Sequence, residues 1–150
     1  MLTNIEKKLI VKEETFCSNT YHPLPVVLKK GKGVFVWDVN NKKYFDYLSS
    51  YSAVNQGHCN KQILNTFIEQ AKKLTLTSRA FYNNKLGSSL EYITRVFGYE
   101  KMLPMNSGAE AVETAIKICR KWGYEVKKVQ YNKAKIIVCD GNFHGRTTTV

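Results

Sequence analysis

The sequence lacks the long apolar runs that membrane insertion requires. No stretch of 18 or more apolar residues occurs in the 150-residue chain, whereas a transmembrane helix needs about 20. The segment MLTNIEKKLIVKEETF at the N-terminus has no apolar signal core, and it is not the Arg- and Ser-rich, acid-poor sequence of a transit peptide. We therefore expect no membrane span and a cytoplasmic protein.

The sequence also lacks the spacings of a metal site. Its four cysteines are far apart and form no Cys-x-x-Cys pair, and its three histidines show no ligand spacing. In a cytoplasmic protein this pattern predicts reduced thiols, buried or on the surface, rather than a disulfide framework. We expect no bound metal. The residues concerned are Cys17, Cys59, Cys119, Cys139, His22, His58 and His144.

Arginine is scarce although the chain is strongly basic. The formal net charge is +11, from 23 basic and 12 acidic residues, but only four of the basic residues are arginines. The 19 lysines are scattered, and the longest cluster is KKGK at residues 29–32. No arginine-rich arm or aromatic RNA-binding motif is present. Scattered lysines are typical of a solvated surface, so we expect no nucleic-acid partner.

Proline is also rare, and two of the three prolines lie in NTYHPLPVV, residues 19–27. This spacing predicts an extended segment after a short amphipathic helix over residues 5–15. The following GVFVWDVNNKKYFDYL predicts a β-hairpin with its turn at Asn40-Asn41. The small and polar residues of SSYSAVNQGHCN, 49–60, predict an irregular loop of the kind that is more often functional than idle.

The second half of the chain alternates helical and strand patterns. Apolar spacing predicts helices over residues 62–74 and 86–97, the second ending at Gly98, with the irregular TLTSRAFYNN between them. A strand at residues 102–105, a helix from 109 to about 123 and a strand at 134–139 then follow. A second strand that is apolar on both sides suits a parallel sheet. We expect the start of a doubly wound α/β sheet.

The beginning of the 109–123 helix has the features of an anion site. Ser107 precedes Glu110 by three residues, which is the spacing of a capping box. Gly108 leaves the backbone open, and the unpaired N–H groups and the helix dipole favour an anion. Many capped helices bind no phosphate, however, so this motif needs a second observation.

The loop after the second strand, GNFHGRTTTV at residues 141–150, supplies that observation. Ligands bind at the carboxyl ends of parallel strands, so this loop and residues 106–108 should face one site. Phe143 offers an aromatic face, and the planar fork of Arg146 could clamp a carboxylate. Together they predict a site for a flat phosphorylated cofactor and an acidic substrate. Without the neighbouring loop, Phe143 would be interpreted as a core residue and Arg146 as a surface residue.

Four blocks of the sequence resemble the class III aminotransferases that use pyridoxal phosphate. The likeness runs from about Tyr21 to Val150, and SSYSAVNQGH and TSRAFYN are similar to the branch that acts on ornithine rather than on acetylornithine or γ-aminobutyrate. The blocks are YHPLPVVLKKGKGVFVWDVNNKKYFDYLSSYSAVNQGHCN, LTLTSRAFYNN, LPMNSGAEAVETAIKICRKWGY and GNFHGRT.

The resemblance implies a fold type I enzyme that is a homodimer. Residues 1–60 would be an N-terminal segment with the hairpin, part of the small domain, and residues 61–150 would begin the large cofactor-binding domain. The implied reaction transfers the δ-amino group of L-ornithine to 2-oxoglutarate. The products would be glutamate and glutamate 5-semialdehyde, which cyclises to pyrroline-5-carboxylate.

The resemblance also implies roles for particular residues. Ser107, Gly108 and Ala109 would hold the cofactor phosphate, and Phe143 would stack on the pyridine ring. In the substrate site, Arg146 would bind the α-carboxylate of ornithine, Tyr21 would help to fix its α-amino and carboxylate end, and Tyr51 would shape the selective pocket. With the α-end held, only the distal amine reaches the cofactor. Without the resemblance, Tyr21 and Tyr51 would be taken for ordinary packing residues.

The sequence departs from the family in one respect. The lysine that binds the cofactor covalently is expected beyond Val150, and none of the 19 lysines lies in a matching context. We therefore assign no catalytic residue here and expect the chain to be the N-terminal part of a longer protein. The alternatives are another ω-aminotransferase, a truncated non-catalytic relative that binds a partner through residues 75–84, and, more weakly supported, a nucleotide-binding or nucleic-acid-binding protein.

Overall fold

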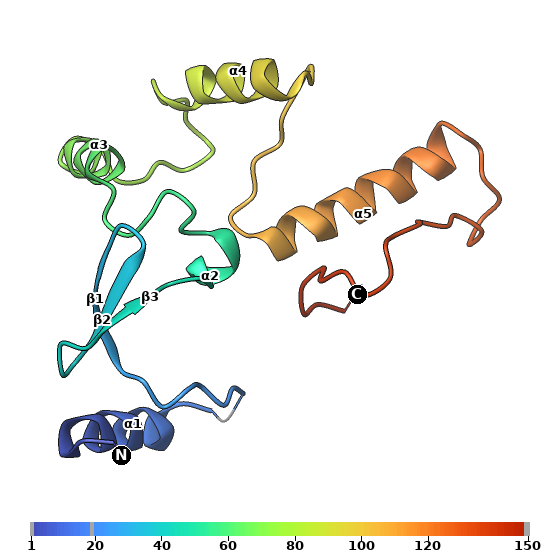
Figure 1. The fold of residues 1–150 in the computed structure, drawn as a ribbon. Coiled ribbons are helices and arrows are strands. Elements are labelled where there is room, and N and C mark those ends of the chain that lie inside the picture. The colour runs from blue at the N-terminus through green and yellow to red at the C-terminus, as the bar shows by residue number, and fades with distance from the viewer. Residues whose placement is uncertain (1, 19, 149–150) are drawn as a thin grey trace. The chain divides into compact units, whose positions relative to one another are not determined.

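The computed structural model describes residues 2–18 and 20–148. Asn19, the first residue of the predicted extended segment, and Thr149 and Val150, which end the second loop, lie outside this description. The chain forms two units, Met1–Ala80 and Phe81–Val150, which are coloured blue to green and yellow to red in Figure 1. Among the described residues, no helix has the length and apolar character that would cross a membrane. The predicted domain division at residue 60 stays a prediction.

The first unit begins with helix α1, Asn4–Phe16, close to the predicted bounds. A capping box fixes its start: Thr3 Oγ1 accepts from the Glu6 N–H at 3.3 Å, and the Thr3 N–H donates to Glu6 Oε2 at 2.8 Å. These two hydrogen bonds satisfy backbone N–H groups that have no partner inside the helix.

A three-stranded antiparallel sheet follows, in the order β1 (Leu28–Lys32), β2 (Phe35–Asp38) and β3 (Lys43–Phe45). Strands β2 and β3 are the predicted hairpin, which is confirmed. Asn41 has a φ of +67° at the turn, as expected for an asparagine. Strand β1 was not predicted, because LKKGK lacks the alternation of apolar residues that marks a half-buried strand.

Asp38 holds the hairpin turn. Its Oδ1 accepts from the N–H groups of Asn40 and Lys42, both at 2.9 Å, and its Oδ2 accepts from the Tyr44 hydroxyl at 2.8 Å. Burial raises the pKa of Asp38, but the hydrogen bonds from Tyr44, Lys42 and Asn40 outweigh it, so the pKa is below its usual value. On the same strand, Val36 is the only apolar side chain that is buried among the described residues.

The segment between β3 and the next long helix contains a turn that the sequence did not predict. The one-turn element α2, Ser49–Ser52, has positive φ angles between +46° and +72° at all four residues. Left-handed backbone costs a non-glycine residue about 1–2 kcal/mol. Helix α3, Lys61–Ala71, then begins at Asn60, whose side chain accepts from two backbone N–H groups, and it ends three residues before the predicted Leu74.

The second unit contains α4 (Leu86–Phe97) and α5 (Gly108–Glu125). Helix α4 has the predicted bounds and ends at Gly98, whose φ of +72° is the left-handed conformation expected of a C-terminal glycine. Across the described helices and strands, contacts between elements occur only within the β1–β2–β3 sheet. The position of the site in this unit is therefore set by loops that pack on α5.

The two strands predicted on either side of α5 do not form. Neither residues 102–105 nor residues 134–139 are paired in a described strand, and no described backbone hydrogen bond joins them. Leu103 is 62% exposed and Ile137 is 96% exposed. A strand exists only when another strand pairs with it, and isolated pairs are at best marginally stable. Both apolar runs are therefore exposed, and within the described residues the prediction of paired strands is wrong.

Candidate functional site

Helix α5 begins with the predicted capping box. Ser107 Oγ accepts from the Glu110 N–H at 3.2 Å, and Glu110 Oε2 accepts from the N–H groups of Asn106 at 2.8 Å and Ser107 at 3.1 Å. One carboxylate therefore fixes the two residues that precede the helix. The Ser107 oxygen accepts in this arrangement, so its O–H is available to donate to a ligand.

The first two backbone N–H groups of α5 have no described acceptor. Neither Gly108 nor Ala109 donates a hydrogen bond within the described residues. A Cβ atom on Gly108 would meet nothing within 4 Å, so a ligand can approach the backbone there. Open N–H groups at the positive end of a helix dipole favour an anion.

The second loop packs directly on this first turn. Gly145 has a φ of +118°, and a Cβ atom there would lie 3.1 Å from the Cβ of Ala109. A Cβ here would be tight against Ala109, and the positive φ also favours glycine. The prediction was that the two loops face one site, and the structure does place both around one hollow. They enclose a hollow of about 400 Å³ that is lined by Gly108, Ala109, Val112, Phe143, His144, Gly145 and Arg146.

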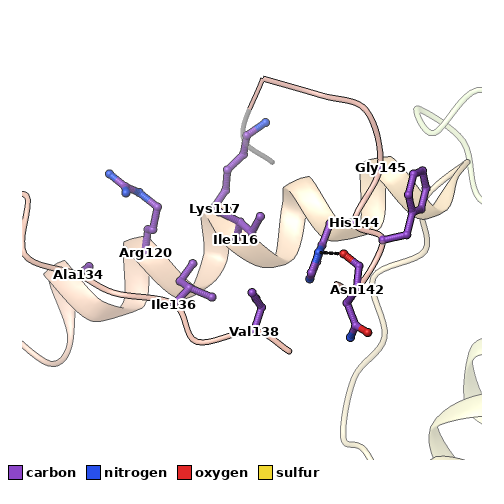
Figure 2. A pocket seen from close by; sticks show the side chains of 10 residues that line it. Ile116, Lys117, Arg120, Ala134, Ile136, Val138, Asn142, His144 and Gly145 are labelled. Carbon is purple, nitrogen blue, oxygen red and sulfur yellow. Dashed lines mark hydrogen bonds between the residues drawn. The ribbon is translucent and has the colours of Figure 1, made fainter. Parts of the chain in front are cut away.

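A larger hollow lies beside the first, between α5 and the segment that returns along it. Gly123 near the end of α5 faces Ala134, where a Cβ on the glycine would lie 3.8 Å from the Ala134 Cβ. Figure 2 shows Ile116, Ile136 and Val138 across this space of about 740 Å³, with the Asn142 carbonyl 2.9 Å from His144 Nδ1 at one end. Lys117 and Arg120 of α5 also line this hollow. Asn142 and His144 lie at its end next to the first turn.

Four of the seven predicted site residues line the smaller hollow, and the structure brings them together: Gly108, Ala109, Phe143 and Arg146. Phe143 is 81% exposed, so its ring can be covered by a ligand. Ser107 caps the adjoining helix. Tyr21 and Tyr51 belong to the first unit, where their side chains are exposed. The binding roles of all seven residues stay predictions.

Sequence reasoning missed two features of this site. His144 lines both hollows, but its sequence context carried no ligand spacing. The close approach of Gly145 to Ala109 was also not predicted, because a contact between loops 36 residues apart leaves no local pattern. A glycine between two predicted ligand-binding residues was the available signal.

Comparison with protein families matches residues 16–150 to the family described as Aminotransferase class-III. Ornithine aminotransferase from Plasmodium falciparum (isolate 3D7) is 62% identical over 135 residues, which are 90% of this chain and 33% of that protein. The mitochondrial ornithine aminotransferase of Drosophila ananassae is 56% identical over 144 residues, which are 96% of this chain and 33% of that protein. The chain thus spans about a third of the length of these relatives.

Solved structures agree with these matches. The ornithine aminotransferase from Toxoplasma gondii ME49 superposes with a TM-score of 0.92 at 41% identity, over 99% of this chain and 38% of that one. An acetylornithine aminotransferase from Elizabethkingia anophelis superposes with a TM-score of 0.88 at 62% identity, over 97% and 36%. A second Toxoplasma gondii structure reports partial occupancy of PLP at the active site. The described helices and strands therefore match a little over a third of these aminotransferase chains.

The contact between the two loops can be tested with a pair of glycine variants. Gly145→Ala should lower the free energy of unfolding by about 2–3 kcal/mol, because backbone strain and overlap with Ala109 add. Gly141→Ala is the matched control: its φ of +71° is also strained, but nothing lies within 4 Å, so it should cost about 1 kcal/mol. Denaturant unfolding measures both, and equal losses would contradict the packing of Gly145 on α5.

Proposed function

Since this chain belongs to the class-III aminotransferase family, we propose that it forms the cofactor-phosphate and substrate-carboxylate side of an ornithine aminotransferase. The protein that carries it transfers the δ-amino group of L-ornithine to 2-oxoglutarate and yields glutamate and glutamate 5-semialdehyde. It has the doubly wound fold type I architecture and acts as a homodimer. The observation that carries this proposal is the hollow where two open N–H groups, Phe143 and Arg146 meet.

The residues at the start of α5 fit the phosphate of pyridoxal phosphate, the cofactor of this family. A phosphate presents several acceptor oxygens and about two negative charges. The N–H groups of Gly108 and Ala109 and the hydroxyl of Ser107 can all donate to it, and no side chain at Gly108 blocks its approach. When bound, the cofactor supplies an electron sink for the carbanion that amino transfer requires.

Phe143 and Arg146 then have distinct roles. The exposed ring of Phe143 offers a flat apolar surface for the pyridine ring. The guanidinium of Arg146 binds the α-carboxylate of ornithine with two parallel hydrogen bonds, a geometry that lysine cannot reproduce. Once the α-end of ornithine is held, the distal amine is the amine that reaches the reacting position. Tyr21 assists at the α-end and Tyr51 shapes the pocket around the substrate chain.

A second substrate has a specific observation in its favour. The acetylornithine aminotransferase from Elizabethkingia anophelis is as similar to this chain as the Plasmodium falciparum relative. Acetylornithine carries the same δ-amine but has a neutral amide in place of the charged α-amine. The choice between the two substrates therefore depends on which residues face the α-nitrogen.

We propose the cytoplasm as the location of this protein, although relatives include mitochondrial enzymes.

The substrate can be assigned by assaying the full-length protein with L-ornithine, N-acetylornithine and γ-aminobutyrate, each with 2-oxoglutarate. We expect kcat/KM to be highest for ornithine, by at least about tenfold. N-acetylornithine has a neutral amide at the α-nitrogen and γ-aminobutyrate has no α-amine, so each leaves polar groups of the site unpaired. A preference for N-acetylornithine or γ-aminobutyrate would replace the proposed substrate and keep the family.

The phosphate site can be tested at Gly108. Gly108→Val should weaken pyridoxal phosphate binding by about 10- to 100-fold, because the β-branched side chain occupies the open approach and charge-assisted hydrogen bonds are lost. Gly87→Val is the control, because Gly87 is also in the first turn of a helix and also has nothing within 4 Å. Cofactor retention after dialysis, followed by absorbance, measures both. Equal retention by the two variants would place the phosphate elsewhere.

The carboxylate site can be tested at Arg146. Arg146→Lys keeps the charge but removes the planar fork, so KM for ornithine should rise about 10- to 100-fold while cofactor retention is unchanged. Arg95→Lys is the control, because Arg95 is exposed and pairs with Glu91 on α4 at 2.8 Å. Steady-state kinetics would contradict the assigned role if Arg146→Lys lowered cofactor retention and ornithine affinity together.

A further inference from the structure

The left-handed turn at Ser49–Ser52 lies in a loop, residues 46–60, that links β3 to α3. Its four residues are three serines and Tyr51, none of which favours positive φ. Such a conformation persists only where the surrounding structure holds it. The turn at Ser49–Ser52 therefore depends on contacts from the residues around it.

Asp46 and His58 close the loop at its base. His58 Nε2 lies 2.6 Å from Asp46 Oδ2, and Asp46 Oδ1 accepts from the Ser49 N–H at 2.9 Å. The hydrogen bonds from His58 and Ser49 lower the pKa of Asp46, so it is an ionised acceptor and the His58 nitrogen is the donor. One carboxylate thus holds the first residue of the left-handed turn and the far end of the loop.

Both members of this pair are anchored to the sheet of the first unit. The Asp46 N–H donates to the Val34 carbonyl at 2.9 Å. His58 exchanges two backbone hydrogen bonds with Gly33, at 2.9 and 2.8 Å. A Cβ atom on Gly31 would lie 2.6 Å from His58 Cγ, so a glycine there leaves room for the imidazole ring. The base of the loop is consequently fixed from two directions.

Tyr51 is the residue that this anchoring directs. Its φ is +56°, and its N–H donates to the Leu48 carbonyl at 2.9 Å. Within the described residues its side chain is 86% exposed. The backbone angles of the turn limit the direction in which it points, since the allowed rotamers depend on φ and ψ.

We propose that Asp46 and His58 form a positioning pair that holds the left-handed turn and thereby directs Tyr51 for the selection of ornithine. The inference rests on the proposed function, in which Tyr51 shapes the substrate pocket. Neither Asp46 nor His58 touches the substrate. Loss of the pair frees the turn to relax toward ordinary backbone angles and moves the Tyr51 ring, while the phosphate site on α5 keeps its own hydrogen bonds.

A double-mutant cycle in the full-length enzyme tests this coupling. His58→Phe keeps a ring over Gly31 but removes the donor to Asp46, and Tyr51→Ala removes the directed side chain. His58→Phe should raise KM for ornithine about five- to tenfold, with KM for 2-oxoglutarate and cofactor retention unchanged. The same change should have little further effect in Tyr51→Ala. His58→Gln, which can present a nitrogen near the position of Nε2, should restore most of the affinity.

Several outcomes would overturn the proposal. They are an equal rise in KM for both substrates, an undiminished effect of His58→Phe in the Tyr51→Ala background, and no effect of His58→Phe at all. His58→Asn, which is too short to reach Asp46, replaces His58→Phe if that variant does not fold. Failure of both variants to fold would show that the Asp46–His58 pair maintains the fold, and this result would also overturn the proposed positioning role. A wild-type enzyme inactive on ornithine would refute the proposed function instead.

Discussion

The close approach of Gly145 to Ala109 is the contact on which the site depends. It brings a loop that carries an aromatic ring and a guanidinium against the turn where two N–H groups are open. A Cβ at Gly145 would be tight against Ala109, so the loop or the helix would have to shift by a few tenths of an ångström. The capping box formed by Ser107 and Glu110 is equally necessary, because it keeps the first turn of α5 in the conformation that the loop contacts.

Local hydrogen bonding, more than burial, shapes the described chain. Val36 is its only buried apolar side chain, yet the turns are well defined, because carboxylates gather backbone N–H groups around them. Asp38 does so in the hairpin and Asp46 in the following loop, while Glu110 does the same at the start of α5. This pattern explains how the turns are well defined in a chain that spans about a third of its relatives' length.

The features predicted from the sequence are those with local causes. Helices α4 and α5 were predicted because Gly98 and the Ser107–Glu110 pair mark their ends within a few residues. The strands predicted at 102–105 and 134–139 did not form, because a strand depends on a pairing partner that the local sequence does not reveal. The Ser49–Ser52 turn was unpredictable for the same reason: serine does not favour positive φ, and the residue that completes its support, His58, follows several residues later.

The start of α5 is proposed to bind the phosphate of pyridoxal phosphate, and the loop at 141–146 to contact its ring and the substrate. A crystal structure of the full-length protein with this cofactor tests it most directly. We predict phosphate oxygens within hydrogen-bond distance of the Gly108 and Ala109 nitrogens, the ring stacked on Phe143, and Arg146 facing away from the phosphate toward the substrate. A phosphate bound away from α5, or one held by Arg146, would contradict it.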